Sequence, residues 1–232
     1  MRVITWLLLG FFALAAQGCA VDRTTWSFDR PDILGSAAIH VEGSPRKIET
    51  PAGPAEQFDG AHDAVFVDAH PLAGAGQFTA QAVFRPDGGD FEQRWMHLAE
   101  TDPKTGKDTG TRFLFEIRVV EDRWYLDAFT KGPGYNQTLA IPAKTFPVRR
   151  WYAVAMTFDG TMFRSYVDGV MQAEAPIDYK PQGPGHASLG TRINRADYFK
   201  GAMYQLQFLG RALPPQEQLK VPAGLNPQEK QD

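Results

Sequence analysis

The sequence has a single cysteine, Cys19, among 232 residues. A chain with one thiol can form no internal disulfide, so a disulfide-stapled fold is excluded. No large cluster of Lys or Arg is present either, and the formal net charge is only -3. These features give no support to binding of nucleic acid or of an anionic membrane surface. We therefore expect no nucleic-acid partner.

Segments with helical periodicity are also scarce, and the one short run spans residues 214–219. The 22 Gly and 17 Pro residues are instead spread along the chain, a distribution typical of many short strands separated by turns. There is no internal repeat, and the hydrophobic fraction of 43% suits a globular protein. We expect one all-β domain over residues 19–220 and a disordered tail over residues 221–232.

The one long apolar run lies at the N-terminus, over residues 3–16, directly after Arg2. It is shorter than the roughly 20 residues that a membrane-spanning helix needs. A basic start followed by a short apolar core predicts a signal peptide, here over residues 1–18. Any contact with a membrane is then expected through an attached lipid only.

The signal peptide ends in the sequence AQGC, which resembles a bacterial lipobox. This resemblance implies cleavage before Cys19 and lipidation of its thiol. Ordinary cleavage after Ala15 or Ala20, with an incidental Cys19, is the alternative. The resemblance also implies outer-membrane sorting, because Ala20 and not Asp follows the cysteine. Export is expected in either case, to the outer membrane, the periplasm or the outside of the cell.

The closing half of the chain alternates strand-like segments with tight turns. Asp159-Gly160 and Asp168-Gly169 supply the positive-φ positions that tight hairpins need. Large aromatic residues in this half are expected to fill the space between two stacked sheets. These aromatic residues are Trp151, Phe158, Phe163, Tyr166 and Phe199.

Six short motifs along residues 57–219 resemble, in their order, a laminin-G-like jelly roll of the concanavalin A-like superfamily. They are Phe58-Asp59-Gly60-Ala61-His62-Asp63, Phe78-Thr79, Trp151-Tyr152, Phe158-Asp159-Gly160, Tyr166-Val167-Asp168-Gly169 and Phe199-Lys200-Gly201. The resemblance implies an all-β, two-sheet antiparallel sandwich. Relatives often bind calcium through Asp side chains, which makes Asp59 or Asp63 a candidate ligand. The sequence shows no complete oxygen cage, and no other cofactor is expected.

A hairpin around Glu121-Asp122 has a register that its own pattern predicts. A two-residue turn sets Arg118 opposite Tyr125 and Glu116 opposite Asp127, on the polar face of the hairpin. A three-residue turn would mix polar and apolar side chains on both faces.

The same alternation extends this polar face to other strands. It is expected to carry Gln81, His97, Glu116, Arg118, Tyr125 and Asp127, with Arg192 and Asn194 as further candidates. The resemblance implies that it is the concave face, where saccharide chains usually lie. The alternative is cross-strand pairing of Arg118 with Glu116 and Asp127, each pair contributing roughly 0.2–1 kcal/mol.

Sequence patterns for catalysis are weak. Retaining jelly-roll glucanases need two carboxyl groups about 5–5.5 Å apart, and the strand motif that supplies them is missing. Residues 198–205 resemble a polysaccharide-lyase segment, but its Gly is displaced and no Gln-x-His occurs. The five His residues show no metal-ligand spacing.

The expected function is therefore non-catalytic binding of a polysaccharide or of a cell-surface glycan or protein. The alternative is a polysaccharide-degrading enzyme, a lyase before a glycoside hydrolase, with Tyr125 or Tyr204 as the base. A third possibility is a purely structural protein of the cell envelope.

Overall fold

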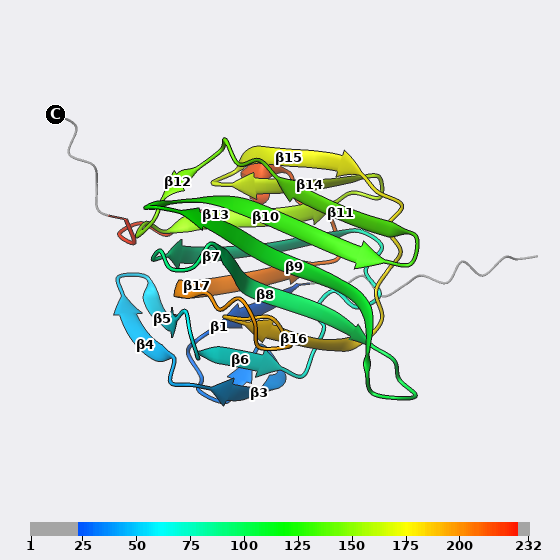
Figure 1. Cartoon of the computed structure of the whole chain (residues 1–232), viewed down its shortest axis with the longest axis horizontal. Helices are drawn as coiled ribbons and strands as arrows, with labels where there is room; N and C mark the ends of the chain where they lie inside the picture. Colours follow the sequence, from blue (N-terminus) through cyan, green and yellow to red (C-terminus); the bar gives the residue numbers. More distant parts are fainter. Residues whose placement is uncertain (1–22, 227–232) are drawn as a thin grey trace, which may run out of the picture.

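The computed structural model describes residues 23–226 and contains two antiparallel β-sheets packed face to face (Figure 1). The predicted two-sheet β sandwich is confirmed. In the described part of the chain, the only helical turn is the 3-10 turn Pro215–Glu217. No helix between residues 23 and 226 is long and apolar enough to cross a membrane. The predicted signal peptide and Cys19 lie outside the described residues.

One sheet has eight strands in the order β15-β14-β13-β7-β17-β5-β4, and β1 pairs with β17. Its strands are β1 (Thr24–Ser27), β4 (Arg46–Thr50), β5 (Gly53–Asp59), β7 (Phe78–Pro86), β13 (Tyr152–Phe158), β14 (Met162–Val167), β15 (Val170–Pro176) and β17 (Lys200–Leu209). The β14–β15 turn contains Asp168 and Gly169 with φ values of 49° and 76°, as the Asp-Gly pair predicts.

The other sheet has nine strands in the order β11-β10-β9-β8-β16-β6-β3-β2, and β12 pairs with β10. Its strands are β2 (Ile33–Leu34), β3 (Ala37–Glu42), β6 (Ala64–Val67), β8 (Glu92–Thr101), β9 (Asp108–Val120), β10 (Arg123–Gly132), β11 (Tyr135–Ala140), β12 (Phe146–Pro147) and β16 (Gly185–Leu189). Figure 1 views this sheet from outside, with β8, β9 and β10 in front of the other sheet.

The β9–β10 hairpin has the predicted register. Val120 pairs with Arg123, Arg118 with Tyr125 and Glu116 with Asp127. The turn starts at Glu121, whose φ of 57° lies in the left-handed region.

The main core fills the space between the sheets. Phe84 lies at its centre, with ring-centroid distances of 5.4 Å to Trp95, 5.2 Å to Trp124 and 5.9 Å to Phe199. Such tilted and edge-to-face contacts add to the free energy gained by burying the rings. Phe158 and Phe163 also lie in this core, as predicted.

Trp95 lies in the core as well, although simple alternation along its strand predicts an outward position. The register between β8 and β9 shifts between Arg94 and Met96, so a β-bulge interrupts the alternation there. Trp95, Met96 and Leu98 consequently all reach the core, while His97 keeps its predicted outward position.

A second, smaller apolar cluster covers the outer face of the eight-stranded sheet. Trp151 belongs to this cluster and not to the core between the sheets, because the neighbouring Tyr152 takes the inward position. Leu225 packs on the cluster, and Asn226 hydrogen-bonds both the N–H and the C=O of Trp151, at 2.8 and 2.9 Å. Residues 221–226 are therefore packed on the sheet, which corrects the prediction of a disordered tail starting at Val221.

Candidate functional site

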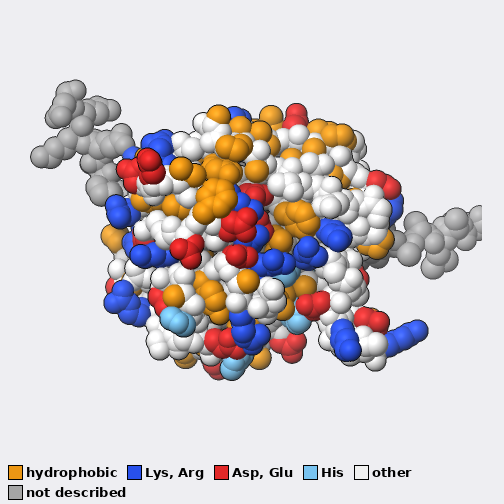
Figure 2. Space-filling model, viewed as in Figure 1, with side chains coloured by type: hydrophobic (Ala, Val, Ile, Leu, Met, Phe, Trp, Pro, Cys, Tyr) orange, Lys and Arg blue, Asp and Glu red, His pale blue; other side chains and the backbone are white. Residues whose placement is uncertain are grey.

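The outer face of the nine-stranded sheet brings together seven of the eight predicted site residues. His97, Glu116, Arg118, Tyr125 and Asp127 occupy outward positions on three adjacent strands, and Arg192 and Asn194 lie in a loop beside them. Figure 2 shows acidic and basic side chains gathered across the middle of this face.

Gln81 is the exception, and its placement corrects the prediction. It belongs to β7 of the eight-stranded sheet, where its side chain donates to Gln207 and accepts the N–H of Leu219. The segment after β17 covers it and leaves it 1% exposed. Alternation fixes which side of its own strand a residue occupies but not the sheet to which the strand belongs.

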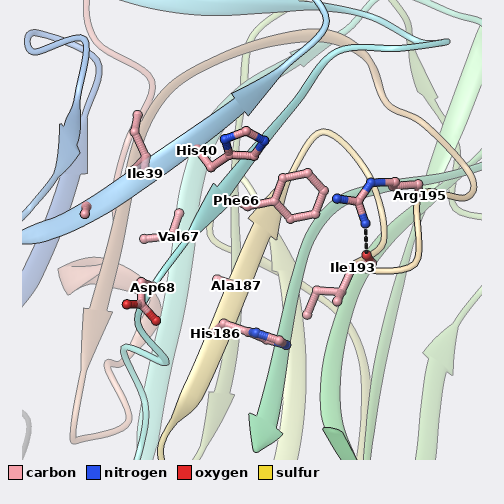
Figure 3. Close-up of a pocket in the computed structure, with 10 residues that line it drawn as sticks. Ile39, His40, Phe66, Val67, Asp68, His186, Ala187, Ile193 and Arg195 are labelled. Carbon is pink, nitrogen blue, oxygen red and sulfur yellow. Dashed lines mark hydrogen bonds between the residues drawn. The ribbon is translucent and has the colours of Figure 1, made fainter. Parts of the chain in front are cut away.

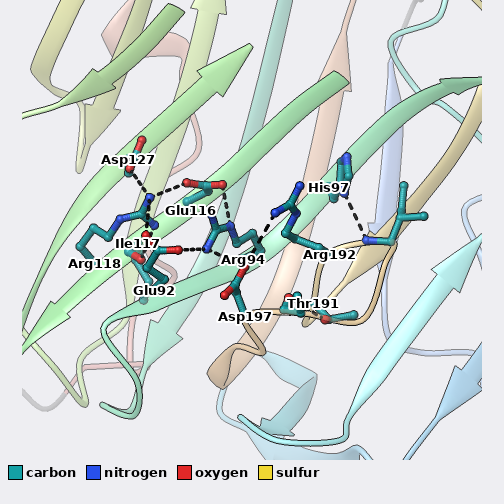
Figure 4. Close-up of polar contacts among 12 residues, drawn as sticks. Glu92, Arg94, His97, Glu116, Ile117, Arg118, Asp127, Thr191, Arg192 and Asp197 are labelled. Carbon is teal, nitrogen blue, oxygen red and sulfur yellow. Dashed lines mark hydrogen bonds and ion pairs between the residues drawn. The ribbon is translucent and has the colours of Figure 1, made fainter. Parts of the chain in front are cut away.

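Six charged residues on the face form what we call the ionic cluster (Figure 4). Its members are Glu92, Arg94, Glu116, Arg118, Asp127 and Asp197. Arg94 contacts Glu116 at 2.7 Å, and Arg118 contacts Glu116 at 3.0 Å and Asp127 at 2.9 Å. The cross-strand pairing that the sequence offered as an alternative is therefore present.

The charged groups of the ionic cluster pair with one another. The Glu116 side chain is 3% exposed and both of its carboxylate oxygens accept from guanidinium groups. Burial raises the pKa of Asp127 to about 6, despite the nearby charge of Arg118, and Glu116 adds to the rise. Four carboxylates share two guanidinium groups here, and Arg192 is 4.0 Å from Asp197. The buried members act mainly as a structural element of the face.

The loop between β16 and β17, residues 190–197, folds back over the sheet. It begins at Gly190, whose φ is +80° and whose position would bring a Cβ atom to 2.4 Å from the Phe58 ring. The N–H of Arg192 donates to the C=O of Ala196 at 3.1 Å, which closes the loop. The N–H of Ile193 donates to His97 Nδ1 at 3.2 Å and ties the loop to β8.

Two hollows flank this loop, and both are lined in part by Ile193. The larger has a volume of about 430 Å³ and the smaller about 190 Å³. In the larger hollow, the Arg195 guanidinium lies 4.7 Å from the centroid of the half-buried Phe66 ring, beside His40 (Figure 3). The sequence did not single out His40, Phe66 or Arg195, although outward alternation along the neighbouring strands β3 and β6 places the first two on this face.

The smaller hollow has Arg112, Arg192 and His97 in its lining. His97 is 5% exposed, and burial together with the charges of Arg192 and Arg112 lowers its pKa to about 3. The ring is therefore neutral near pH 7, and because Nδ1 accepts from Ile193, the proton lies on Nε2.

The two tyrosines of the lyase alternative lie on different sheets. Tyr125 is on β10 with the other site residues, whereas Tyr204 is on β17 of the eight-stranded sheet. The Tyr204 hydroxyl donates to the C=O of Ala52 at 2.7 Å, and the Tyr204 side chain packs against the second apolar cluster. Tyr204 therefore cannot act as a base beside His97, which corrects that part of the alternative.

The candidate calcium ligands Asp59 and Asp63 serve the β5–β6 turn. Asp59 accepts the N–H groups of Ala61, His62 and Asp63, and Asp63 accepts those of Ser44 and Asp59. Within residues 23–226, no three His, Cys, Asp or Glu side chains come together as a metal site.

A family model described as the concanavalin A-like lectin/glucanases superfamily matches residues 59–217. A search among curated protein sequences finds no significant match.

Solved structures of similar fold come from several kinds of protein. One is domain 4 of AbnA, an extracellular arabinanase from Geobacillus stearothermophilus, in complex with arabinotriose, with 17% identity, a TM-score of 0.62, and coverage of 85% of this chain and 96% of that one. The NanB sialidase from Streptococcus pneumoniae has 17% identity and a TM-score of 0.57, with coverage of 74% and 28%.

The receptor-binding domain of botulinum neurotoxin type G has 10% identity and a TM-score of 0.56. The coverage is 84% of this chain and 49% of the toxin domain, so this chain spans about half of it. At such identities the likeness concerns the fold. The match of the family model over more than half of the sequence, together with the two-sheet sandwich, shows that the chain belongs to the concanavalin A-like lectin/glucanases superfamily.

Proposed function

We propose that the protein is a non-catalytic saccharide-binding domain that uses the outer face of the nine-stranded sheet. The observation that carries this proposal is the hollow of about 430 Å³ beside loop 190–197. It combines the aromatic ring of Phe66 with the polar groups of His40 and Asp68, while Arg195, held by Glu42, packs against the ring. Aromatic rings pack on the apolar faces of sugars, and a few placed polar groups bind hydroxyl groups.

The arrangement along the face supports a chain-like ligand over a single sugar. The larger and smaller hollows are adjacent, since Ile193 lines both. A saccharide chain crossing Ile193 would reach Phe66 on one side and Asn194 and Arg192 on the other. The arabinanase domain of similar fold, solved with arabinotriose, is consistent with this use of the fold.

The pairing of Glu116 within the ionic cluster supports binding over hydrolysis. A glycosidase needs one carboxylic acid and one carboxylate beside the bond that breaks. Glu116 is buried and held by Arg94 and Arg118, so it has no free oxygen for a substrate. This function includes capture of a free polysaccharide or of a glycan on a cell surface.

The site is tested by affinity electrophoresis and calorimetry with a panel of plant, algal and bacterial polysaccharides. Phe66→Ala should weaken binding at least about fivefold, since loss of an aromatic contact costs on the order of 1 kcal/mol. Phe91→Ala is the matched control, because Phe91 is 53% exposed and lies near Arg118, away from the larger hollow. Failure of every saccharide to bind would overturn the proposed function, and loss of binding in the Phe91 variant alone would overturn its location.

We also propose that the domain is exported and held at the outer membrane by a lipid on Cys19. The support is the short apolar run after Arg2 and the sequence AQGC at residues 16–19. Labelling with radioactive palmitate should mark the wild-type protein and not Cys19→Ser. Equal labelling of both, or labelling of neither in a cell that labels a known lipoprotein, would contradict the anchor.

A further inference from the structure

The smaller hollow beside loop 190–197 holds two guanidinium groups with little to neutralise them. Arg112 on β9 and Arg192 in the loop both line it, and burial together with the charge of Arg192 lowers the pKa of Arg112. The nearest acid paired with Arg192 is Asp197, at 4.0 Å. The carboxylate of Asp108 also lines the hollow, but it lies 2.8 Å from His186 Nε2.

Three buried N–H donors at this hollow have no acceptor in the described chain. They are Nε of Arg112, Nε of Arg192 and Nε2 of His97. Arg112 donates through Nη1 to the C=O of Gly110 at 3.0 Å, and the His97 ring accepts through Nδ1, so these contacts leave the three donors unused. A buried donor without an acceptor is costly, and more so when it is charged.

An oxyanion fits this combination of charge and donors. A carboxylate or a sulfate ester offers acceptor oxygens to several N–H groups at once, and guanidinium groups bind such groups through charge-assisted hydrogen bonds. A neutral hydroxyl would accept one donor and leave the charge of the two arginines unbalanced. His97 is 5% exposed, and its neutral ring contributes Nε2–H as a donor.

We propose that Arg112, Arg192 and His97 form a subsite for the anionic substituent of an acidic saccharide. This inference rests on the proposed function and adds the ligand class: chains that carry carboxylate or sulfate ester groups. A chain lying on Phe66 would place one such group at the subsite, since Ile193 separates the two hollows.

The test compares charged and uncharged forms of the same chains by calorimetry. One pair is oligogalacturonate and its fully methyl-esterified form, and the other is dextran sulfate and dextran. Binding of one charged form or of both should exceed that of its uncharged partner, and the pair that shows the preference identifies carboxylate or sulfate ester. No preference in either pair would overturn the subsite.

Variants then locate the preference. Arg112→Gln and Arg192→Gln should each weaken binding of the charged chain by about 10- to 100-fold, the loss expected for one charge-assisted hydrogen bond, and so reduce the preference for the charged chain over its uncharged form. Arg164→Gln, on β14 of the opposite sheet, changes the net charge equally and should have no effect. An equal loss in Arg164→Gln, or no loss in the other two, would overturn the assignment.

A probe that needs no saccharide separates failure of this inference from failure of the proposed function. Inorganic sulfate should shift the NMR signals of the Arg112 and Arg192 Nε–H groups and of His97 Nε2–H in the wild-type protein. Sulfate shifts without saccharide binding would overturn the saccharide function while supporting an anion site. If sulfate causes no shifts, the anion site itself is overturned. It is also overturned if the shifts at Arg112 and His97 are the same in Arg192→Gln as in the wild-type protein.

Discussion

The guanidinium of Arg118 lies 2.9 Å from the carboxylate of Asp127, across strands β9 and β10, and both side chains are nearly buried. Asp127 Oδ1 nevertheless has no hydrogen-bond partner in the described chain. One oxygen of this carboxylate is thus paired while the other is desolvated, and burial outweighs the pairing in setting its pKa. This balance makes the stability of the domain depend on pH.

We expect Asp127 to make the domain less stable as pH rises from about 4 to about 7. Its folded pKa of about 6 is raised above the ordinary value of 3.8, so the folded state binds more protons in this interval. The contribution is fully present below the ordinary value and is lost as pH passes the folded pKa, with a size on the order of 3 kcal/mol. Urea denaturation at several pH values should show that the difference in unfolding free energy between wild type and Asp127→Asn changes by this amount over the interval, because the opposite slope from the buried, neutral His70 and His97 is common to both proteins. An unchanged slope in the variant would contradict it, and Asp122→Asn at the exposed turn is the control.

Arg94 should be more important for stability than an arginine on the opposite sheet. Its side chain is 8% exposed and contacts Glu92, Glu116 and Asp197 at 2.7–2.9 Å. Arg94→Ala leaves one oxygen of the buried Glu116 carboxylate without a partner, which costs about 3 kcal/mol. Arg164→Ala removes two partly exposed pairs, with Asp159 and Glu174, each worth about 0.2–1 kcal/mol. Equal losses of unfolding free energy in the two variants would refute a structural role of the ionic cluster.

The segment 221–226 should stabilise the outer face of the eight-stranded sheet. Truncation after Lys220 removes Leu225, which is 8% exposed, and both hydrogen bonds between Asn226 and Trp151. We expect a loss of about 2–5 kcal/mol, with a red shift of tryptophan fluorescence as Trp151 becomes exposed. Truncation after Asn226 is the control and should leave both measurements unchanged. A stable Lys220 truncation with unchanged fluorescence would contradict the packing of this segment.

Gly190 should not tolerate alanine, whereas Gly74 should. Both have positive φ values, +80° and +77°, so both variants bear the backbone cost of roughly 1 kcal/mol. A Cβ at position 190 would also lie 2.4 Å from the Phe58 ring, while nothing lies within 4 Å at position 74. Thermal unfolding should show a further loss of about 1–3 kcal/mol for Gly190→Ala. Similar melting temperatures of the two variants would contradict this prediction and show that the backbone at Gly190 can shift away from Phe58.

Loss of the loop position should also affect ligand binding. Gly190 starts loop 190–197, which carries Arg192 and Ile193 to the two hollows. A Gly190→Ala protein that remains folded at low temperature is expected to bind acidic saccharide more weakly than Gly74→Ala.

The sequence alone determined the local features of this protein. Alternation of polar and apolar residues fixed the register of the Glu121-Asp122 hairpin and therefore set Arg118 opposite Tyr125 and Glu116 opposite Asp127. Asp-Gly pairs fixed tight turns because few residues accept positive φ at low cost. The order of the motifs indicated the two-sheet sandwich and the superfamily.

Only the tertiary structure decided which strands share a sheet and what covers each face. Gln81 and His97 both point outward from their strands, yet they lie on opposite sheets, because strand order depends on contacts distant in sequence. A bulge turned Trp95 inward, and the last residues described packed on Trp151. Arg112 and Arg192 are 80 positions apart, and folding of loop 190–197 over β8 and β9 brings them to one hollow. Their charges therefore became a candidate subsite only in the folded chain.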